Sequence, residues 1–284
     1  MAQDLAEQGI AVIGFDQIHH GERNPTGAPE DLAAFNVVNP EAFRDNFRQS
    51  VVDLVQQVRL CQRLTLPMSL LGRNAALRTD RIAVFGHSQG GISQSIFVAI
   101  DDVTLGGVLS GAGAVLSVAL VEKEEPVDVP TLLRSIVRIG PEADPEGDPL
   151  RLEHPVLSLV QTFAESADPV NYAASAVPSG HSLLQTEGVA DAYTPPSSIE
   201  ALATAAQIPQ VEPVLQPISA LSILGIASVV APVSQNTAFG VSTAGLVQAA
   251  GGHFVAFDDP EVALIRTRFL TSLLLEDVAV IDRL

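Results

Sequence analysis

A serine flanked by glycines is the feature of this sequence best suited to chemistry. Residues 86–90 read Gly-His-Ser-Gln-Gly, with Ser88 at the centre. Arg81 and a short apolar run, 82–85, lead into the motif, and a longer apolar-rich run, 92–100, follows it. This is the G-x-S-x-G pattern in its strand, turn and helix setting, which exposes the serine hydroxyl as a nucleophile. We therefore predict that Ser88 is a catalytic nucleophile.

The glycines around Ser88 separate this interpretation from a plain glycine-rich turn with a bystander serine. The strained turn requires small neighbours, and we expect Gly86 and Gly90 to meet this requirement. Gly91 would let the helix pack close to the strand. A simple turn has no need of glycine on both sides of the serine, so the pattern favours the nucleophile.

A serine hydroxyl needs a base, and the base needs an orienting carboxylate. With this motif the expected chain order is serine, acid, histidine. Of six histidines, only His154, His181 and His253 follow Ser88. His154 lies before a proline in an irregular region, and His181 begins a predicted strand, which places it at the wrong end of a sheet. His253 stands in a glycine-rich loop just before the last predicted helix, so we predict that it is the base.

The acid should follow a strand and precede His253. Asp191 lies in such a loop, after the predicted strand 182–185 and before two prolines. Glu187 is the nearest competitor, but it is closer to the strand and we interpret it as a loop residue. Asp168 precedes the strand and is expected to cap a helix. We predict Asp191 as the acid.

Strands alternate with helices along the chain, which predicts an α/β fold with a mainly parallel sheet and helices on both faces. In such sheets, sites lie at the carboxyl ends of the strands. The predicted strands cover residues 10–15, 82–85, 105–109, 182–185 and 246–249, and the main predicted helices cover 40–64, 89–100, 197–206 and 260–275.

The alternation breaks between residues 114 and 180. This segment contains the acidic, proline-rich run 122–130 and the acidic loop 141–149, with short helical stretches between them. We interpret it as an inserted helical cap. The predicted organisation is a first core part at 1–113, a cap at 114–180 and a second core part at 181–284.

Composition excludes several classes of function. The formal net charge of the 284 residues is −18, with a single lysine, Lys123, and this argues against nucleic acid as a partner. No apolar stretch reaches membrane-spanning length, since 218–233 is interrupted by serine, glycine and proline. Cys61 is the only cysteine, so an intrachain disulfide or a cysteine-based metal site cannot form.

The sequence resembles the α/β-hydrolase superfamily, in particular bacterial serine carboxylesterases and lipases with an inserted cap. The matching residues are the motif 86–90, the Asp191 loop with its Thr-Pro pair, and Gly-His-Phe at 252–254. Residues 5–16, followed by a His-Gly pair at 20 and 21, resemble the fourth strand of that fold and its exit loop. The resemblance implies hydrolysis of carboxylic esters through an acyl-enzyme, without metal or organic cofactor.

One departure concerns the strands that the family places before residue 10, which have no counterpart here. The loop after one of them supplies an oxyanion-hole N–H in the family. The backbone N–H of Gln89 can supply one donor, and His20 with Gly21 is a candidate for the second. Otherwise His19 and His20, like His87, are expected at the pocket or its rim.

The missing strands would also leave a sheet edge open, through which two copies could form a homodimer. The N-terminus lacks the pattern of a signal peptide. We expect a cytoplasmic protein, or an exported one if a missing N-terminal segment carried the signal.

The expected activity is therefore that of a serine esterase or lipase acting on small-molecule or polymeric esters with uncharged, hydrophobic acyl groups. Two alternatives stay open. The same triad also serves peptidases, lactonases and thioesterases, because the chemistry is shared. The fold could also be kept by a catalytically impaired binding protein, which the incomplete N-terminus favours and the three intact catalytic positions oppose.

Overall fold

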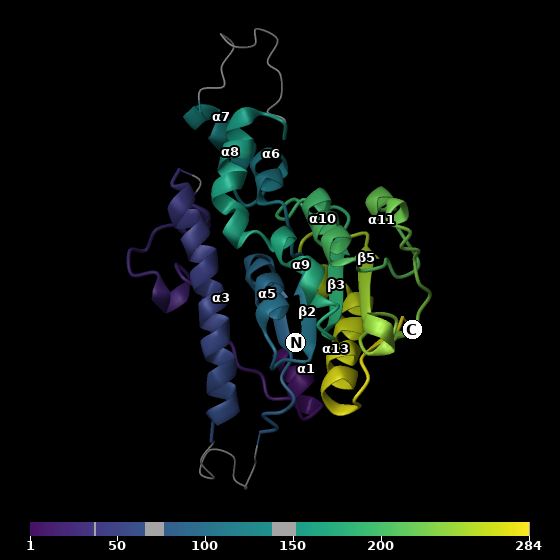
Figure 1. Ribbon diagram of the computed structural model, residues 1–284. Helices are drawn as coiled ribbons and strands as arrows, with labels where there is room; N and C mark the ends of the chain where they lie inside the picture. Colours follow the sequence, from purple (N-terminus) through teal and green to yellow (C-terminus); the bar gives the residue numbers. More distant parts are fainter. Residues whose placement is uncertain (37, 66–76, 138–151, 284) are drawn as a thin grey trace.

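The computed structural model describes residues 1–36, 38–65, 77–137 and 152–283 (Figure 1). Its centre is a sheet of four parallel strands in the order β1-β2-β3-β5. The strands are β1 (Val84–His87), β2 (Gly106–Ser110), β3 (Ser182–Gly188) and β5 (Ala244–Ala249), and an antiparallel pair is formed by β4 (Val233–Ser234) and β6 (Val280–Ile281). The prediction of an α/β fold with a mainly parallel sheet is confirmed.

Helices connect these strands. The α-helices are α1 (Ala2–Glu7), α2 (Glu30–Phe35), α3 (Pro40–Arg63), α5 (Gln89–Ile100), α6 (Ala119–Glu122), α7 (Val129–Val137), α8 (Pro155–Ala164), α9 (Ala173–Ala176), α10 (Pro196–Ala206), α11 (Ser219–Ile223), α12 (Val255–Asp258) and α13 (Pro260–Leu275). Single 3-10 turns are η1 (Gly21–Arg23), η2 (Leu116–Val118), η3 (Glu165–Ala167), η4 (Pro169–Asn171) and η5 (Ala238–Gly240). Within the described ranges, no helix is long and apolar enough to cross a membrane.

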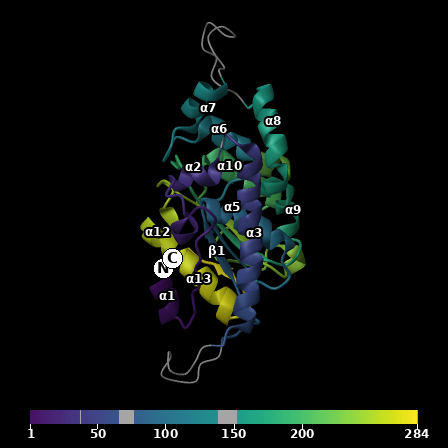
Figure 2. The same ribbon diagram turned by 90° about the vertical axis from the view of Figure 1, so that its left-hand side faces the viewer.

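Both faces of the sheet are buried, which explains why β2, β3 and β5 show no alternation of buried and exposed residues. Neighbouring residues of one strand point to opposite faces: Leu183 packs with α3, α5, α9 and α10, whereas Leu184 packs with α1, α12 and α13. Figure 2 shows α3 and α5 on one side of the molecule and α12 and α13 on the other. The sheet is therefore a rigid middle layer whose carboxyl edge can position side chains.

The segment between β2 and β3 is helical where it is described. Helices α6, α7 and α8 gather beyond one end of the sheet (Figure 1) and share a small apolar cluster of their own, formed by Leu120, Val129, Leu133 and Leu157. Helix α9, at the end of the same segment, packs instead in the core against α5. The predicted acidic loop 141–149 lies outside the described residues.

The predicted strand at residues 10–15 is wrong. The segment is extended but joins no ladder, and Val12 and Ile13 are 44% and 41% exposed rather than buried on both faces. Strand β1 is hydrogen-bonded to β2 alone among the described strands, and a side chain of α3, Gln57, donates to the carbonyl of Ile13 at 3.3 Å. None of the described residues forms a strand beside this run, which leaves its apolar side chains partly exposed.

The start of α10 is fixed by a proline and by a contact with the segment after β2. Helix α10 begins at Pro196, a favourable first residue because it has no N–H to satisfy. The hydroxyl of Ser198, in the first turn of α10, donates to the carbonyl of Ala114 at 2.7 Å. That bond ties α10 to the chain that follows β2.

Candidate active site

Ser88 occupies a strained turn at the carboxyl end of β1. Its backbone has φ 55° and ψ −126°, a region that non-glycine residues rarely adopt. Its N–H donates to the carbonyl of Ser110, the last residue of β2, at 2.8 Å, and its own carbonyl accepts from Ile92 at 3.0 Å. The sharp turn between β1 and α5 therefore holds Ser88 at the edge of the sheet.

Two of the three glycines in this turn are required by close approach. A Cβ on Gly86 would lie 2.6 Å from the carbonyl oxygen of Gly90, and one on Gly91 would lie 2.6 Å from the Cβ of Ala112. The expectation that Gly90 must be small is wrong, since a Cβ there would meet nothing within 4 Å.

The predicted acid and base meet directly. Asp191 follows β3 and His253 follows β5, and their side chains are joined by a 2.7 Å hydrogen bond between Oδ2 and Nδ1. Both side chains are almost completely buried. An ionised carboxylate only accepts hydrogen bonds, so Nδ1 carries the proton and Nε2 is left as a proton acceptor.

Further contacts hold this pair in place. The second carboxylate oxygen of Asp191 accepts from the backbone N–H groups of Tyr193 and Thr194, each at 2.8 Å. The Tyr193 ring stacks on the His253 imidazole, with centroids 4.8 Å apart and planes 9° apart. Gly111, with φ 52°, passes so close that a Cβ would lie 3.0 Å from the imidazole. The orientation of His253 is therefore set from several sides.

His87 lies against the base. Its ring centroid is 4.4 Å from that of His253, and its Nδ1 is 3.0 Å from the Ser110 hydroxyl. Burial, aided by the nearby His253, lowers the pKa of His87 to about 4. It is therefore neutral near pH 7 and places no cation beside the base.

The other predicted histidines lie elsewhere. His19 and His20 are half-buried in the loop after residue 16, where His20 Nδ1 is 3.0 Å from the carbonyl of Ile18. The N–H of Gly21, the candidate second oxyanion donor, already donates to a Glu30 carboxylate oxygen at 3.1 Å. Gln89 is the first residue of α5, so its N–H has no partner within the helix and is free for an oxyanion.

The remaining acids and histidines have structural roles or lie in other places. His154 caps α8, and Asp168 caps η4 as expected while also accepting from the N–H groups of Val115 and Leu116. The interpretation of Glu187 as a loop residue is wrong, since it is fully buried in β3 and accepts from Gln248 at 2.9 Å. None of these residues was joined to His253 by a hydrogen bond in the described structure.

An apolar pocket, here called the Ser88 pocket, opens beside the nucleophile. Its free volume is about 60 Å³. Segments from both the core and the region between β2 and β3 contribute to its wall. The lining residues are Phe35, Pro40, Phe43, Ser88, Ile92, Leu116, Ser117, Ala119, Leu120, Lys123, Val129, Leu133, Val160, Ala164, Tyr193, Thr194, Pro195 and Ser198.

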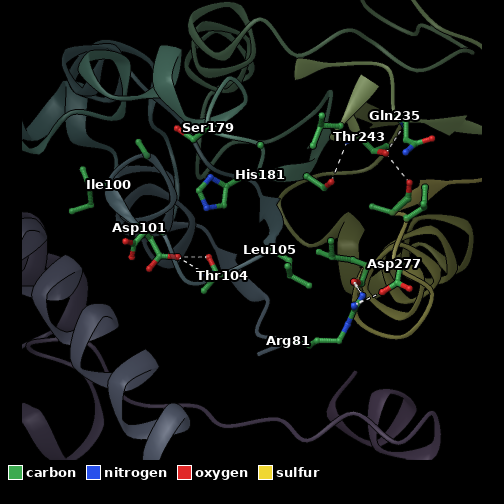
Figure 3. Close-up of a pocket in the computed structure, with 18 residues that line it drawn as sticks. Arg81, Ile100, Asp101, Thr104, Leu105, Ser179, His181, Gln235, Thr243 and Asp277 are labelled. Carbon is green, nitrogen blue, oxygen red and sulfur yellow. Dashed lines mark hydrogen bonds and ion pairs between the residues drawn. The ribbon is translucent and has the colours of Figure 1, made fainter. Parts of the chain in front are cut away.

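A larger pocket, of about 600 Å³, lies at the opposite edge of the sheet (Figure 3). Arg81, Thr104, His181 and Thr243 line it, and each precedes a strand rather than follows one. This places His181 at the amino end of β3, as the sequence indicated. The smaller pocket is the candidate site because it contains Ser88 and adjoins the acid and base.

Lys123 and Tyr193 are pocket residues that the sequence argument did not select. Lys123 is the only lysine of the chain, and this rarity was the one signal that could have drawn attention to it. As for metals, the described residues contain no group of three or more His, Cys, Asp or Glu side chains arranged to hold an ion.

Comparisons with protein-family models, with curated proteins and with solved structures find no match to this chain. The functional argument therefore rests on the geometry of Ser88, Asp191 and His253 and on the pocket beside them.

Proposed function

We propose that this protein is a serine hydrolase that cleaves carboxylic esters, with the α/β-hydrolase organisation that its sequence resembles. The observation that carries the proposal is the 2.7 Å hydrogen bond that His253 donates to Asp191, together with a serine held at positive φ after another strand of the same parallel sheet. The apolar lining of the Ser88 pocket supports esters with a hydrophobic group. The segment 114–180 would act as the cap over this site.

In the proposed reaction, the Ser88 hydroxyl oxygen attacks the ester carbonyl carbon while its proton passes to Nε2 of His253. The tetrahedral oxyanion would be stabilised by the N–H of Gln89. The C–O bond to the alcohol then breaks, and His253 returns the proton to the departing alkoxide. Water attacks the acyl-enzyme in the same manner, releasing the carboxylic acid and restoring Ser88.

One observation favours the alternative of an impaired, binding-only protein. The Gly21 N–H, which could have completed the oxyanion hole, is engaged with Glu30. Loss of one oxyanion donor costs on the order of 100- to 1000-fold in turnover. Peptide, lactone or thioester substrates would use the same three residues.

Hydrolysis of p-nitrophenyl butyrate tests the proposal. We expect turnover by the wild type and a loss of several orders of magnitude in Ser88→Ala, because the nucleophile is gone. Ser117→Ala is the matched control, since Ser117 lines the same pocket but belongs to η2. If Ser88→Ala were as active as the wild type, Ser88 could not be the nucleophile. An inactive wild type would favour the alternative of a catalytically impaired binding protein.

A further inference from the structure

Lys123 introduces a cation into an otherwise uncharged pocket. It directly follows α6, is 7% exposed and lines the Ser88 pocket. Every other described residue of the lining is apolar or carries only a hydroxyl. Burying a lysine ammonium is costly unless it is paired, so its position in this wall requires an explanation.

The Lys123 ammonium makes one hydrogen bond to the described residues, although it has three N–H donors. Of its three N–H donors, one is directed to the carbonyl of Tyr193 at 2.7 Å. The rings of Phe35 and Tyr193 lie 5.5 Å and 5.4 Å from Nζ, which gives a favourable cation–π environment. No carboxylate among the described residues lies within 4 Å of Nζ.

The position of Lys123 relative to the base makes its remaining donors relevant to a substrate. The Tyr193 ring lies against His253 at 4.8 Å, and the Lys123 ammonium lies 5.4 Å from the centre of the same ring. A ligand in the Ser88 pocket can therefore approach both the nucleophile and the ammonium. Burial lowers the pKa of Lys123, while the negative charges of Asp31 and Asp191 oppose this.

We propose that Lys123 selects ligands whose apolar part carries an anionic oxygen, as a carboxylate or a phosphate. For catalysis this inference rests on the proposed function, and the substrate would be an ester bearing such a group. An anion is favoured over a neutral acceptor because it supplies a counter-charge within hydrogen-bond distance, which none of the described carboxylates does, and charge-assisted hydrogen bonds are the stronger ones.

Binding to the Ser88→Ala protein tests the selection without requiring hydrolysis. Octanoate and octyl phosphate are compared with neutral octanamide by calorimetry. We expect at least one anion to bind about 10- to 100-fold more tightly than octanamide, the range of a charge-assisted hydrogen bond. The tighter anion then identifies the carboxylate or the phosphate as the preferred group.

A second substitution, Lys123→Met, should abolish the preference while keeping an unbranched side chain of similar length. Val121→Met is the matched control, because Val121 lies in α6 two residues before Lys123 but outside the lining of the Ser88 pocket, and it should keep the preference. An anion preference that persists in Lys123→Met would overturn the inference, as would equal binding of all three ligands to the Ser88→Ala protein.

A measurement on the unmodified chain covers the case in which Lys123→Met fails to fold. Because the chain has one lysine, acetylation by acetic anhydride can be followed at Lys123 against the N-terminal amine by mass spectrometry. The preferred anion should protect Lys123, and octanamide at equal concentration should not. Equal acetylation of Lys123 with and without the anion would contradict the inference.

The two proposals fail in different ways. Ester hydrolysis that depends on Ser88, without a preference for anions, would support the proposed hydrolase activity and contradict the selection of anions by Lys123. Anion binding that depends on Lys123, in a protein that hydrolyses no ester, would support the anion-binding site and contradict the proposed hydrolase activity.

Discussion

At the scale of single residues, the Asp191 carboxylate links the loop after β3 to the base. One oxygen accepts from His253 and the other from two backbone N–H groups of its own loop. An amide at this position could donate to Nδ1 and stabilise the wrong tautomer of His253. The proton acceptor needed at Nε2 would then be lost.

We therefore expect Asp191→Asn to lower kcat for p-nitrophenyl butyrate by a factor on the order of 10⁴, with the fold unchanged. Glu187→Gln is the matched control, because Glu187 lies on the strand before the same loop but contacts Gln248 rather than His253. It should keep most of the turnover. If the two variants lost activity to the reverse extents, the acid role would belong to Glu187.

Glu187 leads to a second prediction, on stability. Burial raises the pKa of its carboxyl from 4.5 to about 7. Between about pH 4.5 and 7 the folded protein keeps a proton that the unfolded chain releases, so the contribution of Glu187 to the free energy of unfolding falls as the pH rises. It is fully present below this window and absent above it.

Urea denaturation at pH 5 and pH 8 measures this contribution. Glu187→Gln cannot ionise, so it should gain stability relative to the wild type on going from pH 5 to pH 8. Glu124→Gln changes an exposed carboxylate and should follow the wild type at both values. A Glu187→Gln variant whose difference from wild type is the same at both pH values would show that Glu187 is ionised in the folded protein.

At the scale of elements, the turn from β1 into α5 depends on specific glycines. Gly91→Ala should destabilise the protein by about 1–3 kcal/mol, because its Cβ would lie 2.6 Å from the Cβ of Ala112. Gly90→Ala, one residue away in the same helix, meets nothing within 4 Å and should be neutral or slightly stabilising. Chemical denaturation measures the free energy of unfolding of both variants. Equal destabilisation would show that the close contact of residue 91 with Ala112 does not determine the loss of stability.

An element could be predicted well from the sequence where the residues that determine it lie within or next to it in the chain. Helix α13 has the predicted bounds, since Pro260 starts it and Asp259 caps it within the same few residues. The meeting of Asp191 and His253 followed from parallel strands sharing one carboxyl edge. The segment 10–15 could not be judged in this way, because burial of an apolar run depends on a distant pairing partner.

The Ser88 pocket could not be predicted in detail for a similar reason. Lys123 stands in an acidic, proline-rich run with no helical or strand period, and only the fold brings it beside Tyr193. Likewise, no local pattern showed that Gly90 faces open space while Gly91 packs against Ala112. The pairing of Asp191 with His253 could be predicted from residue type and order, whereas the lining of the pocket depends on non-local packing.

At the scale of the whole molecule, the carboxyl ends and the amino ends of the strands carry different groups and different pockets. The carboxyl ends of the strands carry Ser88, Asp191, His253 and a narrow apolar pocket, while the wider pocket of Figure 3 lies at their amino ends. The side of β1 away from β2 has no ladder partner in the described structure, and the exposed Val12 and Ile13 precede it in the chain. Formation of a homodimer through the unpaired side of β1 stays a prediction.

The central claim is that the fold makes one serine hydroxyl a nucleophile. A fluorophosphonate probe tests it directly, because the activated oxygen displaces fluoride from phosphorus and stays covalently attached. Peptide mapping by mass spectrometry should place the label on Ser88 in the folded protein, with none in Ser88→Ala or after denaturation. A folded wild type that takes no label, or carries it on another serine such as Ser117, would contradict the account.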